Sequence, residues 1–389
     1  MGADQITKGL SLWLDEKRGS RQNSIGVLGR ENLPGPEPSM SAEIVPVILC
    51  GGSGSRLWPM STPERPKQFL KLFGGRSTFE MAVERAFGIA GVHSILVVSN
   101  SQLRGHIHEQ LVGLTRTASI LFEPSGRNSA PAIAAACAYL AETAPESIAV
   151  FMSADHNIPD AAAFGRAVEA SVDAAEKGRI VTLGLRPSSP STAYGYILPE
   201  NSTDPVQTVR AFVEKPDANT AAQYMRDGYL WNSGTFVGKP ETLLSEIARY
   251  APAVLDASQL AIRQRTAIDG AWELGPAFAE APSISIDHAV MERTDLASVV
   301  PSSFEWADVG AWDAVKAAVP VDENGNSVTD QVLMIESSNC LVNAPAGSKV
   351  ALIGVKDLAV IVAPDGSILV CGLASTQAVR QAADHFGQR

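Results

Sequence analysis

Residues suited to phosphate binding gather directly behind the apolar run EIVPVIL. The segment at residues 50–70 reads CGGSGSRLWPMSTPERPKQFL. Small residues let backbone N–H groups turn inward and approach phosphate oxygens, and an arginine can form a forked contact with a polyphosphate. Two prolines restrict where the ammonium of Lys67 can point. We therefore predict a phosphate-binding loop that contains Gly51, Gly52, Gly54, Ser55, Arg56 and Lys67.

Two familiar glycine-rich fingerprints do not fit this segment. The dinucleotide fingerprint G-x-G-x-x-G needs a third glycine, and Leu57 stands in its place. The ATPase loop needs a lysine directly after its last glycine, and none follows Gly54. A nucleotide loop for some other chemistry and a plain Gly-Ser turn with solvated charges both remain open on these residues alone.

The surrounding pattern predicts the elements that position this loop. From Ile44 onward, apolar runs typical of buried strands alternate with helical runs such as residues 77–91 and 129–144. Ser77 and Glu80 predict a capping box, and Gly91 a helix end. The order of strand and helix predicts a parallel sheet with helices on both faces.

Ligands of such sheets bind outside the carboxyl ends of the strands, so the polar segments that follow strands are the candidates for chemistry. These segments are GGSGSR, EPSGRN, SADHN and VEKP. They contain carboxylates, amides and cations.

The organisation changes after about residue 320, where short strands are broken by Gly, Pro, Asn and Asp. The spacing is compatible with a β-helix or a small sandwich, closed by the helix STQAVRQAADHFG. We predict a flexible extension at 1–42, the main α/β domain at 43–320 and a small β domain at 321–389.

Composition excludes several classes of protein. The net charge of -11 and pI near 5.1 argue against nucleic-acid and membrane surfaces as partners. Four widely spaced cysteines suggest neither a zinc knuckle nor a disulfide framework, which favours a reducing compartment. No stretch is long and apolar enough to span a bilayer, and the first residues lack a secretory signal. We expect a cytoplasmic protein.

Eight motifs in a fixed order carry a resemblance to a known family. VILCGGSGSRLWPMSTPERPKQFL is followed by EPSGRNSAPA, FMSADH, AYGYI, FVEKPD, WNSGTF, SIDHAVME and FEWADVGAWDA. Together they resemble the mannose-1-phosphate guanylyltransferases, or GDP-mannose pyrophosphorylases, over residues 44–320. The resemblance implies a Rossmann-like nucleotidyltransferase domain with a mixed, mainly parallel sheet, followed by a β-helix-like domain. It also implies that GTP and mannose 1-phosphate are converted to GDP-mannose and pyrophosphate.

The resemblance assigns roles to residues at the matching positions. Arg56, Lys67 and Lys215 correspond to the cations of the reaction, and Asp155 and Asp308 to the ligands of Mg²⁺. The residues implied to lie by the nucleotide are Gly51, Gly52, Gly54, Ser55, Arg56, Lys67, Glu123 and Asn128. The residues implied to bind the sugar phosphate are Gly195, Glu214, Lys215, Asn232 and Asp287.

The resemblance has a departure and leaves alternatives. The family usually has an aromatic residue where His288 stands. The residue that reads guanine does not follow from residue types. A pyrophosphorylase for another sugar or nucleotide and a non-catalytic nucleotide-sugar-binding relative are the alternatives. We expect a homodimer, and no isomerase domain of the cupin type that some family members carry after the transferase.

Overall fold

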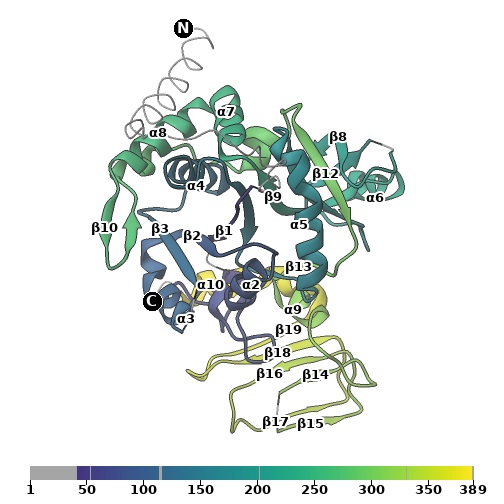
Figure 1. Cartoon of the computed structure of the whole chain (residues 1–389). Coiled ribbons are helices and arrows are strands. Elements are labelled where there is room, and N and C mark those ends of the chain that lie inside the picture. The colour runs from purple at the N-terminus through teal and green to yellow at the C-terminus, as the bar shows by residue number, and fades with distance from the viewer. Residues whose placement is uncertain (1–41, 53, 114–115, 201, 330, 388–389) are drawn as a thin grey trace, which may run out of the picture.

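The computed structural model describes residues 42–52, 54–113, 116–200, 202–329 and 331–387. The predicted extension at 1–42 lies outside these residues except for Ala42. Figure 1 shows a large α/β part and, at its lower end, a stack of short strands formed by the C-terminal residues.

Eleven strands of the described chain form one mixed sheet, in the order β10-β11-β3-β2-β1-β4-β9-β6-β12-β8-β7. The parallel pairings β11-β3-β2-β1-β4 form one half, whereas β9 runs antiparallel between β4 and β6. The mixed sheet is thus confirmed. Its strands are β1 (Ile44–Cys50), β2 (Ser94–Asn100), β3 (Thr117–Glu123), β4 (Ile148–Ser153), β6 (Ile180–Leu185), β7 (Tyr196–Pro199), β8 (Gln207–Val213), β9 (Leu230–Gly238), β10 (Thr266–Ile268), β11 (Ala271–Glu273) and β12 (Ala297–Ser302).

Helices cover both faces of this sheet, as predicted (Figure 1). Successive strand side chains alternate between faces, so Val47 packs in one hydrophobic core and Ile48 in the other. The core on one face contains residues of α4 (Ser129–Thr143), α7 (Pro240–Tyr250) and α8 (Pro252–Arg263). The core on the other face contains residues of α2 (Thr78–Phe87), α3 (Arg104–Leu111), α5 (Ala161–Glu176) and α6 (Ala218–Arg226).

The first residue of α2 agrees with the predicted capping box, but its last residue does not agree with the predicted helix end. The Ser77 hydroxyl accepts from the Glu80 N–H at 3.0 Å and the Glu80 carboxylate accepts from the Ser77 N–H at 2.8 Å, which confirms the capping box. The helix ends at Phe87 with Gly88 as its cap, so the prediction of Gly91 as the stop is wrong. Gly91, with φ of 75°, lies in the turn that follows.

The C-terminal strands form the predicted β-helix-like domain. Parallel strands of two sheets alternate along the chain, and buried side chains such as Cys340, Val342 and Leu352 form a core of their own. Helix α10 (Val379–Phe386) then packs on the 3-10 helix Ser55–Leu57 of the loop. The strands are β14 (Ser327–Val328), β15 (Val332–Ile335), β16 (Leu341–Asn343), β17 (Val350–Ile353), β18 (Leu358–Val362) and the antiparallel β19 (Ile368–Gly372). Across the described part of the chain, the structure contains no helix long and apolar enough to cross a membrane.

Candidate active site

Lys67 lies between the two aspartates expected to bind metal. Asp155 follows the carboxyl end of β4, and Asp308 belongs to β13 (Ala307–Asp308), which pairs with β5 (His156–Asn157). This short ladder brings Asp308 beside His156. The Nζ of Lys67 lies 2.8 Å from Asp155 Oδ2 and 3.3 Å from Asp308 Oδ1, and it donates to the Val309 carbonyl oxygen at 3.0 Å.

Burial and neighbouring charges shift the pKa values of this group. The Lys67 residue is 8% exposed, and although burial alone lowers its pKa, the Asp155 and Asp308 carboxylates raise the pKa overall. Burial alone would raise the pKa of Asp155, but Lys67 and then His156 hold it well below its usual range. Burial lowers the pKa of His156, and its Nδ1 accepts from Trp306 Nε1 at 3.3 Å. The group therefore holds two carboxylates around one ammonium, with the imidazole of His156 beside them.

The two carboxylates fit a divalent cation. Mg²⁺ usually takes one or two carboxylates and completes its shell with waters and substrate phosphates. The described residues contain no group of three or more His, Cys, Asp or Glu side chains placed to hold a metal. Asp155 and Asp308, which face the same ammonium, are a carboxylate pair of the kind that such an ion could use.

The glycine-rich loop lies against the stem of Lys67. Gly54 has φ of 64°, and a Cβ at this position would lie 2.6 Å from Lys67 Cβ, so only glycine fits without displacing the lysine. Arg56 Nη1 donates to Gln377 Oε1 at 2.8 Å, and a Cβ at Gly310 would lie 3.3 Å from Arg56 Nη2. Arg56 thus lies between the C-terminal domain and the segment that follows Asp308.

A cavity of about 380 Å³ opens at the carboxyl ends of the parallel strands. Its lining includes Gly51, Gly52, Glu123, Asn128 and Asp287, so it brings predicted nucleotide and sugar residues together. Ser153 and His156, which flank Asp155, also line it. The volume suits part of a nucleotide or a sugar.

Glu123 is the unusual group of this cavity. It ends β3, is 8% exposed, and burial raises its pKa to about 8. Glu123 lines the cavity, and no described residue forms a hydrogen bond or ion pair with its carboxyl group. The carboxyl is therefore available to a ligand.

The side chain of Asn128 caps the start of helix α4. Its Oδ1 accepts from the Ser129 N–H at 2.8 Å at the start of α4, and its φ is 68°, in the left-handed region. Local strain of this kind is common where a side chain or backbone group must face a ligand.

The five predicted sugar residues form one cluster. Asn232 Nδ2 donates to Asp287 Oδ1 at 3.0 Å, and the Asn232 N–H donates to the Gly195 carbonyl oxygen at 2.8 Å. A Cβ at Gly195 would lie 2.5 Å from Glu214 Oε2. Lys215 Nζ donates to Glu214 Oε1, and Lys215 has φ of 48° before Pro216.

Charges within this cluster interact. Burial and then the Glu214 carboxylate raise the pKa of Asp287 to about 6. The Glu214 side chain is 8% exposed, whereas that of Lys215 is 61% exposed, so the ammonium reaches outward from a buried carboxylate. The cluster thus holds buried acidic side chains beside one exposed ammonium, which contacts Glu214.

The structure adds residues that the sequence analysis missed. His156 lies beside Asp155 and lines the cavity, and Thr182 Oγ1 donates to Asn232 Oδ1 at 3.0 Å. Glu292 accepts from the Glu214 N–H at 3.1 Å and contacts His288 Nδ1 at 3.1 Å. Thr182 carries the one hydroxyl group in the otherwise apolar strand IVTLGL. This feature of the sequence could have identified it as a candidate.

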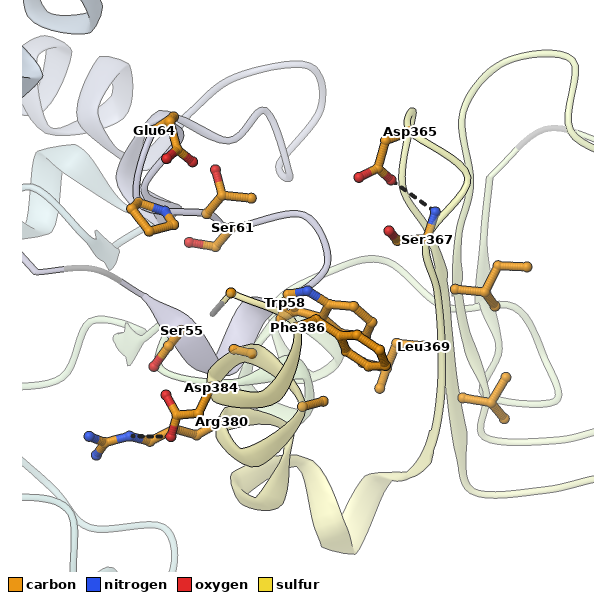
Figure 2. A pocket seen from close by; sticks show the side chains of 17 residues that line it. Ser55, Trp58, Ser61, Glu64, Asp365, Ser367, Leu369, Arg380, Asp384 and Phe386 are labelled. Atoms are coloured by element: carbon orange, nitrogen blue, oxygen red, sulfur yellow. Dashed lines mark hydrogen bonds and ion pairs between the residues drawn. The ribbon is translucent and has the colours of Figure 1, made fainter. Parts of the chain in front are cut away.

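Ser55 lies on the other side of the loop, in a larger groove of about 1190 Å³ between the loop and the C-terminal domain. Figure 2 shows Trp58 and Phe386 face to face in this groove, with Ser55 and Arg380 at one end and Asp365 and Ser367 at the other. Ser55 therefore does not line the cavity that contains Gly51 and Gly52.

Comparisons with known proteins agree with this architecture. Residues 45–324 match a family model described as nucleotidyl transferase, and residues 330–385 match a MannoseP isomerase/GMP-like beta-helix domain. The chain is 38% identical over 355 residues to a mannose-1-phosphate guanylyltransferase of Klebsiella pneumoniae, covering 89% of this chain and 74% of that protein. It is 39% identical over 337 residues to the alginate biosynthesis protein AlgA of Pseudomonas aeruginosa, covering 84% and 69%.

A solved structure extends the likeness to three dimensions. The crystal structure described as mannose-1-phosphate geranyltransferase from Thermus thermophilus matches with a TM-score of 0.79 and 31% identity, over 89% of this chain and 99% of that one. The two family-model matches span the sheet and the β-helix-like domain. The chain belongs to the mannose-1-phosphate guanylyltransferase family of nucleotidyl transferases.

Proposed function

We propose that this protein transfers the guanylyl group of GTP to mannose 1-phosphate. A phosphate oxygen of the sugar attacks the α-phosphorus of GTP, the new P–O bond forms, and the bond to the β-phosphate oxygen breaks to release pyrophosphate. The observation that carries the proposal is the placement of Lys67 and two carboxylates beside a cavity that Asp287 lines together with Gly51, Gly52, Glu123 and Asn128. The names of the Klebsiella and Pseudomonas relatives support this reaction and a role in polysaccharide biosynthesis.

Positioning and charge neutralisation dominate this reaction because two anions must meet. Arg56 and Lys67 extend from the two ends of the glycine-rich loop, where they would neutralise the triphosphate, and Gly51, Gly52, Gly54 and Ser55 would offer backbone N–H groups. Asp155 and Asp308 would hold Mg²⁺, which would neutralise phosphate charge when bound.

Glu123 is our candidate for reading guanine. The Watson–Crick edge of guanine presents N1–H and N2–H donors side by side, and a carboxylate accepts both. Because burial raises the pKa of Glu123 to about 8 in the ligand-free protein, the carboxyl would release its proton on binding the base. The adenine edge presents one donor and one acceptor. Glu123→Gln should therefore reduce the preference for GTP over ATP, whereas an unchanged preference would remove Glu123 from base recognition. Asn128 would contribute through the backbone that it caps.

The sugar phosphate would bind at the second cluster. Glu214, Asn232 and Asp287 would accept from or donate to sugar hydroxyls, and the backbone at Gly195 would face the ring. The exposed ammonium of Lys215 would pair with the phosphate of the sugar.

A pyrophosphate-release assay tests the proposal against its alternatives. Several nucleoside triphosphates are crossed with several sugar 1-phosphates, with and without Mg²⁺, and GTP with mannose 1-phosphate should give the highest kcat/KM. Faster turnover with ATP or UTP, or with another sugar phosphate, would make the protein a related pyrophosphorylase. Silence under every condition would favour a non-catalytic nucleotide-sugar-binding relative.

We further propose a homodimer in the cytoplasm. Apolar side chains of the β domain, such as Leu333, Ile353 and Ile368, are 56–62% exposed, which favours contact with a second copy. The four cysteines are free thiols, as suits a reducing compartment. Light scattering of the purified chain should give twice the mass of one chain, and a monomer mass would contradict the dimer.

A further inference from the structure

We propose that Lys67 is the counter-ion of Asp155 and Asp308 in the metal-free protein, and that a divalent cation displaces its ammonium toward the triphosphate. This inference rests on the proposed function. It assigns Lys67 two successive places, one on the carboxylates and one on the nucleotide.

The contacts of Lys67 support the first place. Its Nζ touches both carboxylates, and among the described residues no other lysine or arginine forms an ion pair with either of them. The carboxylates that would hold the cation are therefore those that already share this ammonium. A divalent ion bound there beside an unmoved Lys67 would meet a like charge in a largely buried site, which is unfavourable.

The packing of Lys67 supports a movement limited to its tip. The residue begins the 3-10 helix Lys67–Phe69 after Pro66, and its Cβ and Cγ lie against Gly54 of the loop. The backbone and the stem are therefore held, so a displacement of the ammonium would occur about the bonds beyond Cγ and would also break its contact with the Val309 carbonyl oxygen. An ammonium released from the carboxylates stays beside the glycine-rich loop, where the phosphates would bind.

The exchange has a thermodynamic consequence. When no nucleotide is bound, a metal must break the ion pairs of Lys67, which weakens its binding. When nucleotide is bound, its phosphates provide a new partner for the displaced ammonium, so metal binding costs less free energy. Nucleotide and metal should therefore each strengthen the binding of the other, by the same factor, through Lys67.

Binding of Mn²⁺ alone, followed by electron paramagnetic resonance of the free ion, tests the exchange without turnover. Lys67→Met should bind Mn²⁺ at least about tenfold more tightly than the natural protein, because the competing cation is gone. Lys71→Met is the matched control. It also removes a positive charge, but from a lysine four residues further along the chain whose side chain is 58% exposed. Adding Asp155→Asn to Lys67→Met should abolish the gain.

The outcomes separate this inference from the proposed reaction. Mn²⁺ affinity that is unchanged or weaker in Lys67→Met, or that rises equally in Lys71→Met, overturns the exchange even if the natural protein makes GDP-mannose. If circular dichroism shows that Lys67→Met does not fold, Lys67→Gln removes the charge, keeps a polar tip, and should tighten Mn²⁺ binding in the same way.

Discussion

The indole ring of Trp58 stacks on the ring of Phe386, with centroids 5.2 Å apart and planes inclined by 13°. The last helix of the β domain therefore lies directly on the glycine-rich loop. Leu57, the neighbour of Trp58, is fully buried in a cluster with side chains of both domains, and Trp312 Nε1 donates to the Trp58 carbonyl oxygen at 3.0 Å. The C-terminal domain is thus part of the support of the loop that carries Arg56.

Removing the stacked ring should weaken GTP binding. An aromatic pair contributes about 1 kcal/mol, so Phe386→Ala should raise KM for GTP roughly fivefold as the loop loosens. KM for mannose 1-phosphate should change little. Phe386→Tyr keeps the ring and serves as the control. An unchanged KM for GTP in Phe386→Ala would show that the stack does not hold the loop.

Loss of the Lys67 ammonium should be costly for the chemical step. Lys67→Ala should lose about 3 kcal/mol of transition-state stabilisation, or roughly a hundredfold in kcat/KM, by analogy with the loss of a charge-stabilising donor. Lys71→Ala, which changes an exposed lysine of the same segment, should retain activity. Equal turnover of Lys67→Ala and the natural protein would place Lys67 outside the mechanism.

Glu123 should make stability depend on pH. Its folded-state pKa of about 8 lies above the ordinary value of 4.5, so the folded protein holds a proton that the unfolded chain releases between these values. The free energy of unfolding should therefore fall as pH rises from about 4.5 to 8, at most on the order of 1 kcal/mol per pH unit.

Urea denaturation of the ligand-free protein at several pH values checks this effect. Glu123→Gln cannot ionise, so its stability should fall less over the same range and exceed that of the natural protein above pH 8. Parallel curves for the two proteins would mean that the carboxyl is already ionised at neutral pH.

A methyl group at Gly195 should disturb the sugar cluster. The added carbon would lie 2.5 Å from Glu214 Oε2, so the carboxylate must move. Gly195→Ala should raise KM for mannose 1-phosphate by about tenfold and leave KM for GTP unchanged. Gly105→Ala, at an open position in α3, is the matched control. A rise in both KM values would indicate general misfolding instead of local displacement.

We expect His288 to have little effect on the selectivity between sugar phosphates. Its side chain is 53% exposed and contacts Glu292 Oε2 at 3.1 Å, so it is connected to the sugar cluster only through Glu292, which accepts from the Glu214 N–H. His288→Phe restores the aromatic residue that the family usually has, and should leave the kcat/KM ratio of mannose to glucose 1-phosphate within about twofold. A larger change in this ratio would assign His288 a part in selectivity.

Local features of the fold could be predicted because they depend on residues close in the chain. The capping box at Ser77 follows from a four-residue pattern, and the strands from apolar runs. The end of α2 could not be fixed in this way, because Gly88 and Gly91 offer similar local signals.

The sequence by itself determined which polar segments follow strands, which residues could meet phosphate, and the family through the order of its motifs. Only the tertiary structure decided that Lys67 is shared by Asp155 and Asp308, which is 241 residues away. That contact depends on the pairing of β5 with β13 and on packing between distant segments, which the type and spacing of residues do not specify. The burial that raises the pKa of Glu123 arises in the same way, from side chains that meet only in the folded chain.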